Sequence, residues 1–138
     1  MLPRLPRLIA CFIMILAACA ERSRPSPSEP TDAQLSVELL EPAHGATVVA
    51  GRETEIRVLG RDREGENRLS GLGYMARASG ITLDSVVIRF AARADSSHTF
   101  RFEVPTELAA NSRLDLFGIA LGPADSRATD MHSVVVTQ

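Results

Sequence analysis

The sequence predicts an all-β fold, an antiparallel sandwich of about seven strands, and two observations carry that prediction. From Leu35 onward, apolar and polar residues alternate with a period of two in short stretches bounded by Gly, Pro, Asn and Asp, which is typical of half-buried strands. No long stretch carries the apolar spacing of a helix. Since a single sheet would leave the apolar side of every strand in water, two sheets must pack against each other.

The alternation predicts strands over 35–39, 54–60, 68–77, 84–93, 98–104, 113–121 and 132–138. The clearest of them contains "TFRFEV", in which Phe100, Phe102 and Val104 share one face. That face is expected to point into the core, and Arg101 and Glu103 are expected to face water.

Other segments complete the predicted sandwich. In "DSVVIRFAAR", the alternation places Val86, Ile88 and Phe90 on one face. The polar stretches "DREGEN" and "ASG" predict turns. The stretch "PTELAANS", residues 105–112, predicts one helical turn with Thr106 as its cap.

The composition limits both the core and the partners. The chain of 138 residues has no Trp, one Tyr and five Phe, so Val, Leu and Ile must fill most of the core. The formal net charge is -2, and it becomes more negative if Arg4 and Arg7 are removed with a leader. Nucleic acid is therefore not an expected partner, because phosphate contacts need clustered cations.

The first nineteen residues have the pattern of an export signal. "MLPRLPR" is basic, and residues 8–18, "LIACFIMILAA", form an uninterrupted apolar run. As a helix this run would be about 16 Å long, too short for a hydrocarbon core of about 30 Å. A basic segment followed by a short apolar segment is typical of a signal peptide.

The run ends in "LAAC", Leu16 to Cys19, which resembles the lipobox of bacterial lipoproteins. The resemblance implies that residues 1–18 are a lipoprotein signal peptide, and that Cys19 is acylated and becomes the first mature residue. The acyl chains would attach the protein to a membrane of the cell envelope, and Ala20 favours the outer membrane. The alternative is an ordinary signal peptide in which Cys19 is coincidental.

Residues 19–34 separate this cysteine from the predicted domain. The stretch contains three Pro and three Ser, and apolar residues are almost absent, so it is predicted to be a disordered, flexible linker. In polyproline form, its fourteen residues from Glu21 to Gln34 would reach roughly 40 Å. The predicted domain covers residues 35–138 and contains no cysteine, so packing must stabilise it without disulfides.

Three stretches of that domain, "LLEPAHGATVVAG", "EIRVLGRDREG" and "FRFEVPTELAANSRLDLFGIAL", resemble bacterial immunoglobulin-like domains. The resemblance implies an immunoglobulin-like β-sandwich over residues 35–138. The chain departs from that pattern because it has no buried Trp, no Cys pair and no tyrosine corner.

Two motifs suggest binding chemistry, and a structural explanation is preferred for each. "GLGYMA" matches a dinucleotide fingerprint, but it lacks the strand–helix context that the fingerprint needs. It is interpreted as a strand whose glycines allow close contact. Asp62, Glu64 and Glu66 could supply oxygen ligands to Ca²⁺. Because arginines are interleaved with them, a solvated turn is preferred to a metal site.

Catalysis has no local signal in the sequence. His44, His98 and His132 are far apart in the chain, and no G-x-S-x-G stretch is present. The chain is therefore expected to be no enzyme and to need no cofactor, although a hydrolase site assembled in space remains an alternative.

These observations predict a lipid-anchored binding or structural module of the bacterial cell envelope. Loops at one end of a sandwich commonly carry recognition, and the candidate stretches are "DREGEN", "ASGITLD" and "GPADSRATD". The candidate binding residues are Asp62, Arg63, Glu64, Asp125 and Arg127. The expected partners are the membrane, through acyl chains on Cys19, and an envelope protein or polysaccharide. The alternative function is an inhibitor or a chaperone-like accessory subunit of an exported enzyme or secretion system.

Overall fold

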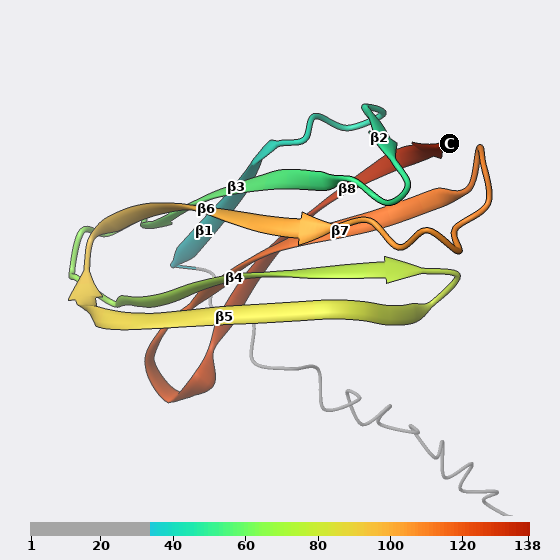
Figure 1. The fold of residues 1–138 in the computed structure, drawn as a ribbon. Coiled ribbons are helices and arrows are strands. Elements are labelled where there is room, and N and C mark those ends of the chain that lie inside the picture. The colour runs from blue at the N-terminus through green and yellow to red at the C-terminus, as the bar shows by residue number, and fades with distance from the viewer. Residues whose placement is uncertain (1–33) are drawn as a thin grey trace, which may run out of the picture.

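Eight strands and one short 3-10 turn appear in the computed structural model, which describes residues 34–138 (Figure 1). In chain order they are β1 (Leu35–Glu41), β2 (Thr47–Val49), β3 (Glu53–Asp62), β4 (Leu69–Ala78), β5 (Ile81–Arg93), β6 (Asp95–Glu103), β7 (Arg113–Leu121), η1 (Pro123–Asp125) and β8 (Arg127–Thr137). The lipidation candidate Cys19 and the signal-peptide and linker predictions lie outside the described residues, apart from Gln34.

The strands form two layers. β1, β3 and β6 make a three-stranded sheet, and β2, β8, β7, β4 and β5 make a five-stranded sheet in that order. Neighbouring strands are antiparallel except for the short β2, which runs parallel to β8. Along the described residues the chain changes sheet five times, and the shortest of these crossings is Ala94, between β5 and β6. The predicted all-β, antiparallel sandwich is confirmed.

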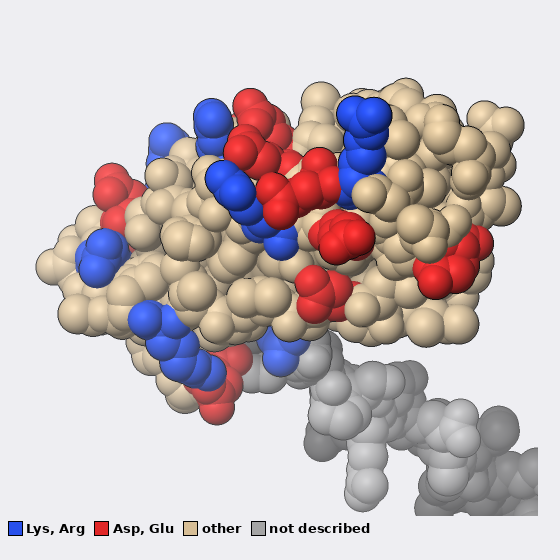
Figure 2. All heavy atoms as spheres, in the orientation of Figure 1, with Lys and Arg blue, Asp and Glu red and all other residues tan. Residues whose placement is uncertain are grey.

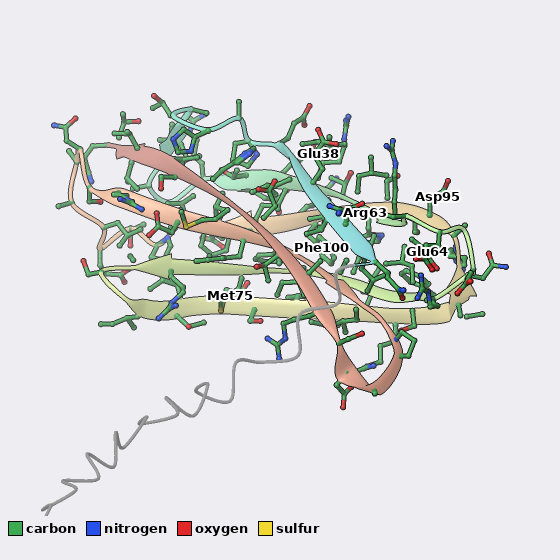
Figure 3. The ribbon with its side chains drawn as sticks, turned by 180° about the vertical axis from the view of Figure 1, so that it is seen from behind. Glu38, Arg63, Glu64, Met75, Asp95 and Phe100 are labelled. Carbon is green, nitrogen blue, oxygen red and sulfur yellow. The ribbon has the colours of Figure 1, made fainter. Side chains whose placement is uncertain are left out.

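The core lies between the two sheets and is built mainly from Leu, Val and Ile. Three aromatic rings sit among them: Tyr74 lies 5.2 Å from Phe100 and 6.1 Å from Phe102, between ring centroids. Phe100 is 5% exposed and Phe102 is 4% exposed, and Figure 3 shows Phe100 between the layers. The predicted register of this strand is confirmed, with Arg101 on the solvent side.

The hairpin between β4 and β5 follows the predicted turn at "ASG". Ser79 and Gly80 both have positive φ, 49° and 78°, and Ala78 pairs directly with Ile81. Two consecutive residues with positive φ are typical of the two-residue turn that matches strand twist. The turn is short enough that Ile81 already begins β5, so most of "ASGITLD" is strand rather than loop.

Other boundaries also differ from the sequence prediction. β2 was not predicted, because three residues are too few to show an alternation. The predicted helical turn at 105–112 is instead a pair of turns, closed by bonds from the Leu108 N–H to the Pro105 carbonyl and from the Ser112 N–H to the Ala109 carbonyl. β8 begins at Arg127 rather than at His132, because the segment pairs with the end of β7.

The predicted shared face of Val86, Ile88 and Phe90 in β5 is confirmed, but this face is less buried than its apolar side chains suggest. Ile88 and Phe90 are partly buried against the core, but Val86 is 38% exposed. β5 is the edge strand of the wider sheet, so the narrower three-stranded sheet does not cover all of its inner face.

The described chain starts and finishes at opposite ends of the sandwich. Leu35 pairs with Asp62, beside the 62–68 loop, whereas Thr137 pairs with Val49 at the other end, where Figure 1 marks the C-terminus. Arg63, Glu64 and Asp95 gather near the start of β1 in Figure 3. Within residues 34–138, no helix has the length and apolar character needed to cross a membrane.

Candidate functional site

Three rows of side chains cross the outer face of the five-stranded sheet. Because successive side chains of a strand point to opposite faces, the residues that pair across the strands share one side. From β5 through β4 and β7 to β8, the rows are Ser85–Met75–Phe117–Met131, Val87–Gly73–Ile119–Thr129 and Arg89–Gly71–Leu121–Arg127. The outer face is therefore largely apolar, with arginines at both sides of the third row.

A groove of about 740 Å³ runs over these rows, and we call it the outer groove. Its lining residues are Met75, Arg77, Ser85, Val87, Arg89, Phe117, Ile119, Leu121, Asp125, Arg127 and Thr129. A volume of this size lies within the usual range for ligand sites, which are mostly apolar with a few placed polar groups.

Two glycines of "GLGYMA" lie beneath the outer groove. A Cβ at Gly73 would be 2.5 Å from the Val86 carbonyl oxygen and 2.8 Å from the Val87 side chain. A Cβ at Gly71 would be 2.9 Å from the Ile88 carbonyl oxygen. The motif is thus a strand with close backbone contact, as interpreted from the sequence. The missing side chains let Val87 lie across β4.

The outer groove carries three arginines and one acid in a chain whose net charge is -2. Arg89 and Asp125 form an exposed ion pair, with Nη2 and Oδ1 separated by 3.5 Å. Arg77 donates from Nη2 to the Gly80 carbonyl at 2.8 Å, and its buried Nε has no hydrogen-bond partner among the described residues. On the side of the molecule seen in Figure 2, acidic and basic side chains are interspersed over large uncharged areas.

The structure separates the predicted binding residues into two groups. Asp125 and Arg127 border the outer groove, and Arg127 belongs to β8 rather than to a loop. Asp62, Arg63 and Glu64 lie at the 62–68 loop and line neither the outer groove nor the second pocket described below. "DREGEN" and η1 are at one end of the sandwich and the Ser79–Gly80 turn is at the other, so the predicted loops do not form one recognition surface.

Asp62 is not part of a solvated turn, which corrects the sequence interpretation. It is the last residue of β3 and is 6% exposed. Arg68 donates from Nη2 to Oδ1 at 2.9 Å and from Nε to Oδ2 at 3.1 Å. The backbone N–H groups of Glu64 and Arg68 also donate to this carboxylate. The hydrogen bonds from Arg68 lower the pKa of Asp62 far below its usual value, against the opposing effect of burial.

The other two carboxylates of the calcium candidate also face Arg68. Arg68 Nη2 lies 3.1 Å from Glu64 Oε2, and Arg68 Nε lies 3.6 Å from Glu66 Oε2. The guanidinium of Arg68, which directly follows "DREGEN", therefore contacts all three acids, so this arginine competes with any cation for the carboxylates. Within residues 34–138, no group of three or more His, Cys, Asp or Glu side chains is arranged to hold a metal ion.

Asp62→Asn is expected to lower the melting temperature by about 10 °C, because it removes the charge that pairs with the part-buried Arg68. The Asp62 pKa is depressed in the folded protein, so its contribution is present above about pH 4 and is lost as the pH falls below that value. The difference between wild type and variant should thus be constant near neutrality and shrink in acid. Thermal melts across pH measure it, with the exposed Asp95→Asn as the control. A difference that persists in acid would contradict this role.

The fold brings together two histidines that are far apart in the sequence. The rings of His44 and His132 lie edge to face, 6.0 Å apart. The Ser133 N–H donates to His44 Nδ1 at 3.2 Å, whereas the Ser133 hydroxyl donates to Asp115 at 2.6 Å. His132 Nδ1 bonds the Pro42 carbonyl at 2.9 Å. The serine hydroxyl is thus bonded to a carboxylate rather than to a histidine, so these residues do not form the serine–histidine pair of a catalytic triad.

Tyr74 is a buried polar residue that sequence reasoning missed. It is 1% exposed, and its hydroxyl donates a short hydrogen bond to the Asp84 carboxylate. Burial, followed by this hydrogen bond, raises the pKa of Tyr74 well above its usual value. Its only sequence signal was its inward position between Leu72 and Ala76 in the strand alternation, since a buried tyrosine hydroxyl needs a partner.

The ionisation of Tyr74 can be measured directly because it is the only tyrosine in a chain without Trp. In the folded protein, the tyrosinate absorbance is expected to stay absent to about pH 11, whereas in denaturant it should appear around pH 10. A raised pKa contributes stability below the unfolded-state value and loses it as the pH rises above that value. Identical titration curves in buffer and denaturant would contradict the buried hydrogen bond.

A second, smaller pocket of about 580 Å³ lies at the opposite end from the 62–68 loop. The Ser79–Gly80 turn and residues 107–115 line it, and none of the predicted binding residues is among them. Its Arg113 and Asp115 form an ion pair, with Nε and Oδ1 separated by 2.6 Å. The net charge of this pocket is therefore smaller than that of the outer groove.

The two packed sheets form an immunoglobulin-like all-β sandwich. Their edge strands β5 and β6 are joined by Ala94, where the chain passes from one sheet to the other. No protein-family model matches the sequence, and the comparison with curated proteins gives no match.

Several solved structures are similar to this chain in fold. OgpA from Akkermansia muciniphila has a TM-score of 0.52 at 10% identity, over 82% of this chain and 33% of that protein. An engineered protein has a TM-score of 0.50 at 19% identity, over 77% of this chain and 21% of its own. The fibronectin(III)-like modules of CbhA from Clostridium thermocellum give 0.47 at 16% identity, over 74% and 96%. The chain spans about a third or less of the first two proteins, and these similarities concern the fold alone.

Proposed function

We propose that this chain is a lipid-anchored module of the bacterial cell envelope that acts by binding a partner rather than by catalysis. The observation that carries the binding role is the outer groove, an open surface that combines five apolar side chains with three arginines. The anchor rests on "LAAC" at residues 16–19, directly after a basic and an apolar segment.

The residues of the outer groove support a non-catalytic role. Its lining contains no His and no Cys, the usual general base and the most reactive nucleophile of enzymes. Ser85 is its one serine, and the lining holds no histidine that could activate its hydroxyl. The arginines can bind and orient anionic groups, which is a recognition task.

The entry point of the domain fits an anchored module. The described chain begins at Gln34, whose carbonyl accepts from the Arg63 N–H at 2.8 Å and whose amide donates to Glu64 at 3.2 Å. The end that carries the 62–68 loop and η1 would thus be the nearer end to the membrane. The outer groove begins at this end with Arg89, Asp125 and Arg127, and extends away along β4.

Replacing the proposed anchor tests the first half of this function. Wild-type protein is expected to partition with membranes and to incorporate a palmitate analogue, whereas Cys19→Ser should lose the label because acyl transfer needs the cysteine thiolate. Cys11→Ser is the matched control, since it removes the other cysteine of the chain within the predicted leader. Mass measurement of the mature amino terminus locates the cleavage.

Equal labelling of wild type and Cys19→Ser would refute the anchor, as would a soluble wild-type protein with unmodified Cys19. Affinity purification from solubilised membranes then separates a binding module from an accessory subunit by the partner: an exported enzyme or a secretion component would favour the accessory role.

A further inference from the structure

We infer that the outer groove binds an extended, acidic and partly apolar peptide segment of another envelope protein. The inference deepens the proposed binding role by naming the class of partner. It rests on the length of the groove, its apolar surface and the placement of its arginines.

The outer groove has the dimensions of an extended peptide. It follows β4 from the row of Gly71 to Arg77, seven residues whose six steps span about 20 Å at roughly 3.3 Å each. A bound segment of about seven residues would cover this length, and every second side chain would face the sheet. The Val87 and Leu121 side chains lie over Gly73 and Gly71, so the segment would rest on these two side chains at this point.

The surface under such a segment suits aliphatic side chains. Met75, Val87, Phe117, Ile119 and Leu121 line the outer groove, and Val87 is 43% exposed. Phe117 is the one aromatic residue among the lining residues. A sugar ring would be expected to stack on several exposed aromatic faces, which this groove does not offer, so the apolar surface favours a peptide over a polysaccharide.

The positions of the arginines favour a segment that carries an acidic residue near each end. Arg89 and Arg127 belong to the row that contains Gly71, at either side of the groove. Arg77 lines it six residues further along β4. Guanidinium groups bind carboxylates in bidentate geometry. Asp125 is the one acidic lining residue, and it lies on the rim with a side chain that is 84% exposed. A carboxylate near each end of the segment therefore meets an arginine, and at the second end it shares Arg77 with Asp115, the cross-strand neighbour of Arg77 on β7.

A labelled peptide tests this assignment directly. The probe is Glu-Ser-Val-Ser-Leu-Thr-Glu with blocked ends, which places two carboxylates and two apolar side chains on one face of a strand. Its neutral counterpart replaces both Glu by Gln. Fluorescence anisotropy with the full chain, purified in a non-ionic detergent, is expected to show saturable binding of the acidic peptide. The neutral peptide should bind roughly tenfold more weakly, about 1.4 kcal/mol.

The chain offers a matched pair of arginine variants. Arg89 lies in the outer groove with a 64% exposed side chain and an ion pair of 3.5 Å to Asp125. Arg101 lies on the other sheet with a 69% exposed side chain and an ion pair of 3.5 Å to Glu53. Arg89→Gln is expected to weaken binding of the acidic peptide roughly fivefold, and Arg101→Gln should leave it unchanged. Thermal melts verify that both variants fold.

Equal binding of the two peptides, or equal loss in the two arginine variants, would overturn the inference, as would the absence of saturable binding. Direct binding of polygalacturonate, without saturable binding of the peptide, would assign the groove to a polysaccharide and overturn the inference as well. These outcomes are independent of the anchor: a wild-type protein without acyl chains would refute the anchoring half of the proposed function, yet leave the peptide measurements intact.

Discussion

Phe102→Ala is expected to destabilise the domain by about 3 kcal/mol or more, and Phe100→Ala by a similar amount. Both rings are almost fully buried between the sheets, and both lie against Tyr74. Each truncation therefore removes buried apolar surface and leaves a cavity that the rigid sheets cannot fill. Denaturant unfolding monitored by circular dichroism measures the free-energy difference.

The control for these variants is the residue between them. The Arg101 side chain is 69% exposed and makes one surface ion pair, to Glu53. Arg101→Ala should therefore change the free energy of unfolding by less than about 0.5 kcal/mol. If Arg101→Ala cost more than either phenylalanine variant, the register of β6 would be shifted by one residue and every side chain of the strand would exchange faces.

Gly73→Ala is expected to cost at least about 2 kcal/mol, although it adds a single methyl group. The new Cβ would lie 2.5 Å from a backbone oxygen of β5, and a backbone atom cannot rotate away as a side chain can. β4 and β5 would have to separate, which would disturb both the edge strand and the outer groove. Thermal and denaturant melts measure the loss, and amide hydrogen exchange should localise it to β5.

Gly118→Ala is the matched control, on the neighbouring strand β7 and directly opposite Tyr74. Its added Cβ would find its nearest neighbours at 3.4–3.6 Å, which is ordinary contact. The variant is expected to stay within about 1 kcal/mol of wild type. A tolerated Gly73→Ala beside a damaging Gly118→Ala would show that the close approach of β4 and β5 does not constrain the fold.

The class of fold could be predicted because the alternation in each strand is a local property. "TFRFEV" and "RLDLFGIAL" needed no knowledge of their neighbours to be recognised as strands. β2 could not be predicted, and neither could the depth of Val86, because both depend on which strand lies beside them and on the unequal widths of the two sheets.

The outer groove could not be predicted for the same reason, since its rows combine residues from four strands. One signal was nevertheless present. From Leu116 to Leu121 the sequence is apolar at every position, which departs from the alternation and indicates a strand shielded on both faces. The burial of Asp62 left no such signal, because the sequence does not distinguish an arginine that pairs with an acid from one in water.

The antiparallel pairing of β1 with β3 has a mechanical consequence. β1 begins at Leu35 and pairs with β3 through six residue pairs along its length. A tether to a surface would apply tension at Gln34 along the axis of β1. Because the β1–β3 hydrogen bonds run perpendicular to the strands, this tension would load all of them in shear at the same time. Such a geometry resists pulling far better than one that opens bond by bond. The strand that follows the proposed anchor is thus paired in the geometry that best resists a pulling force.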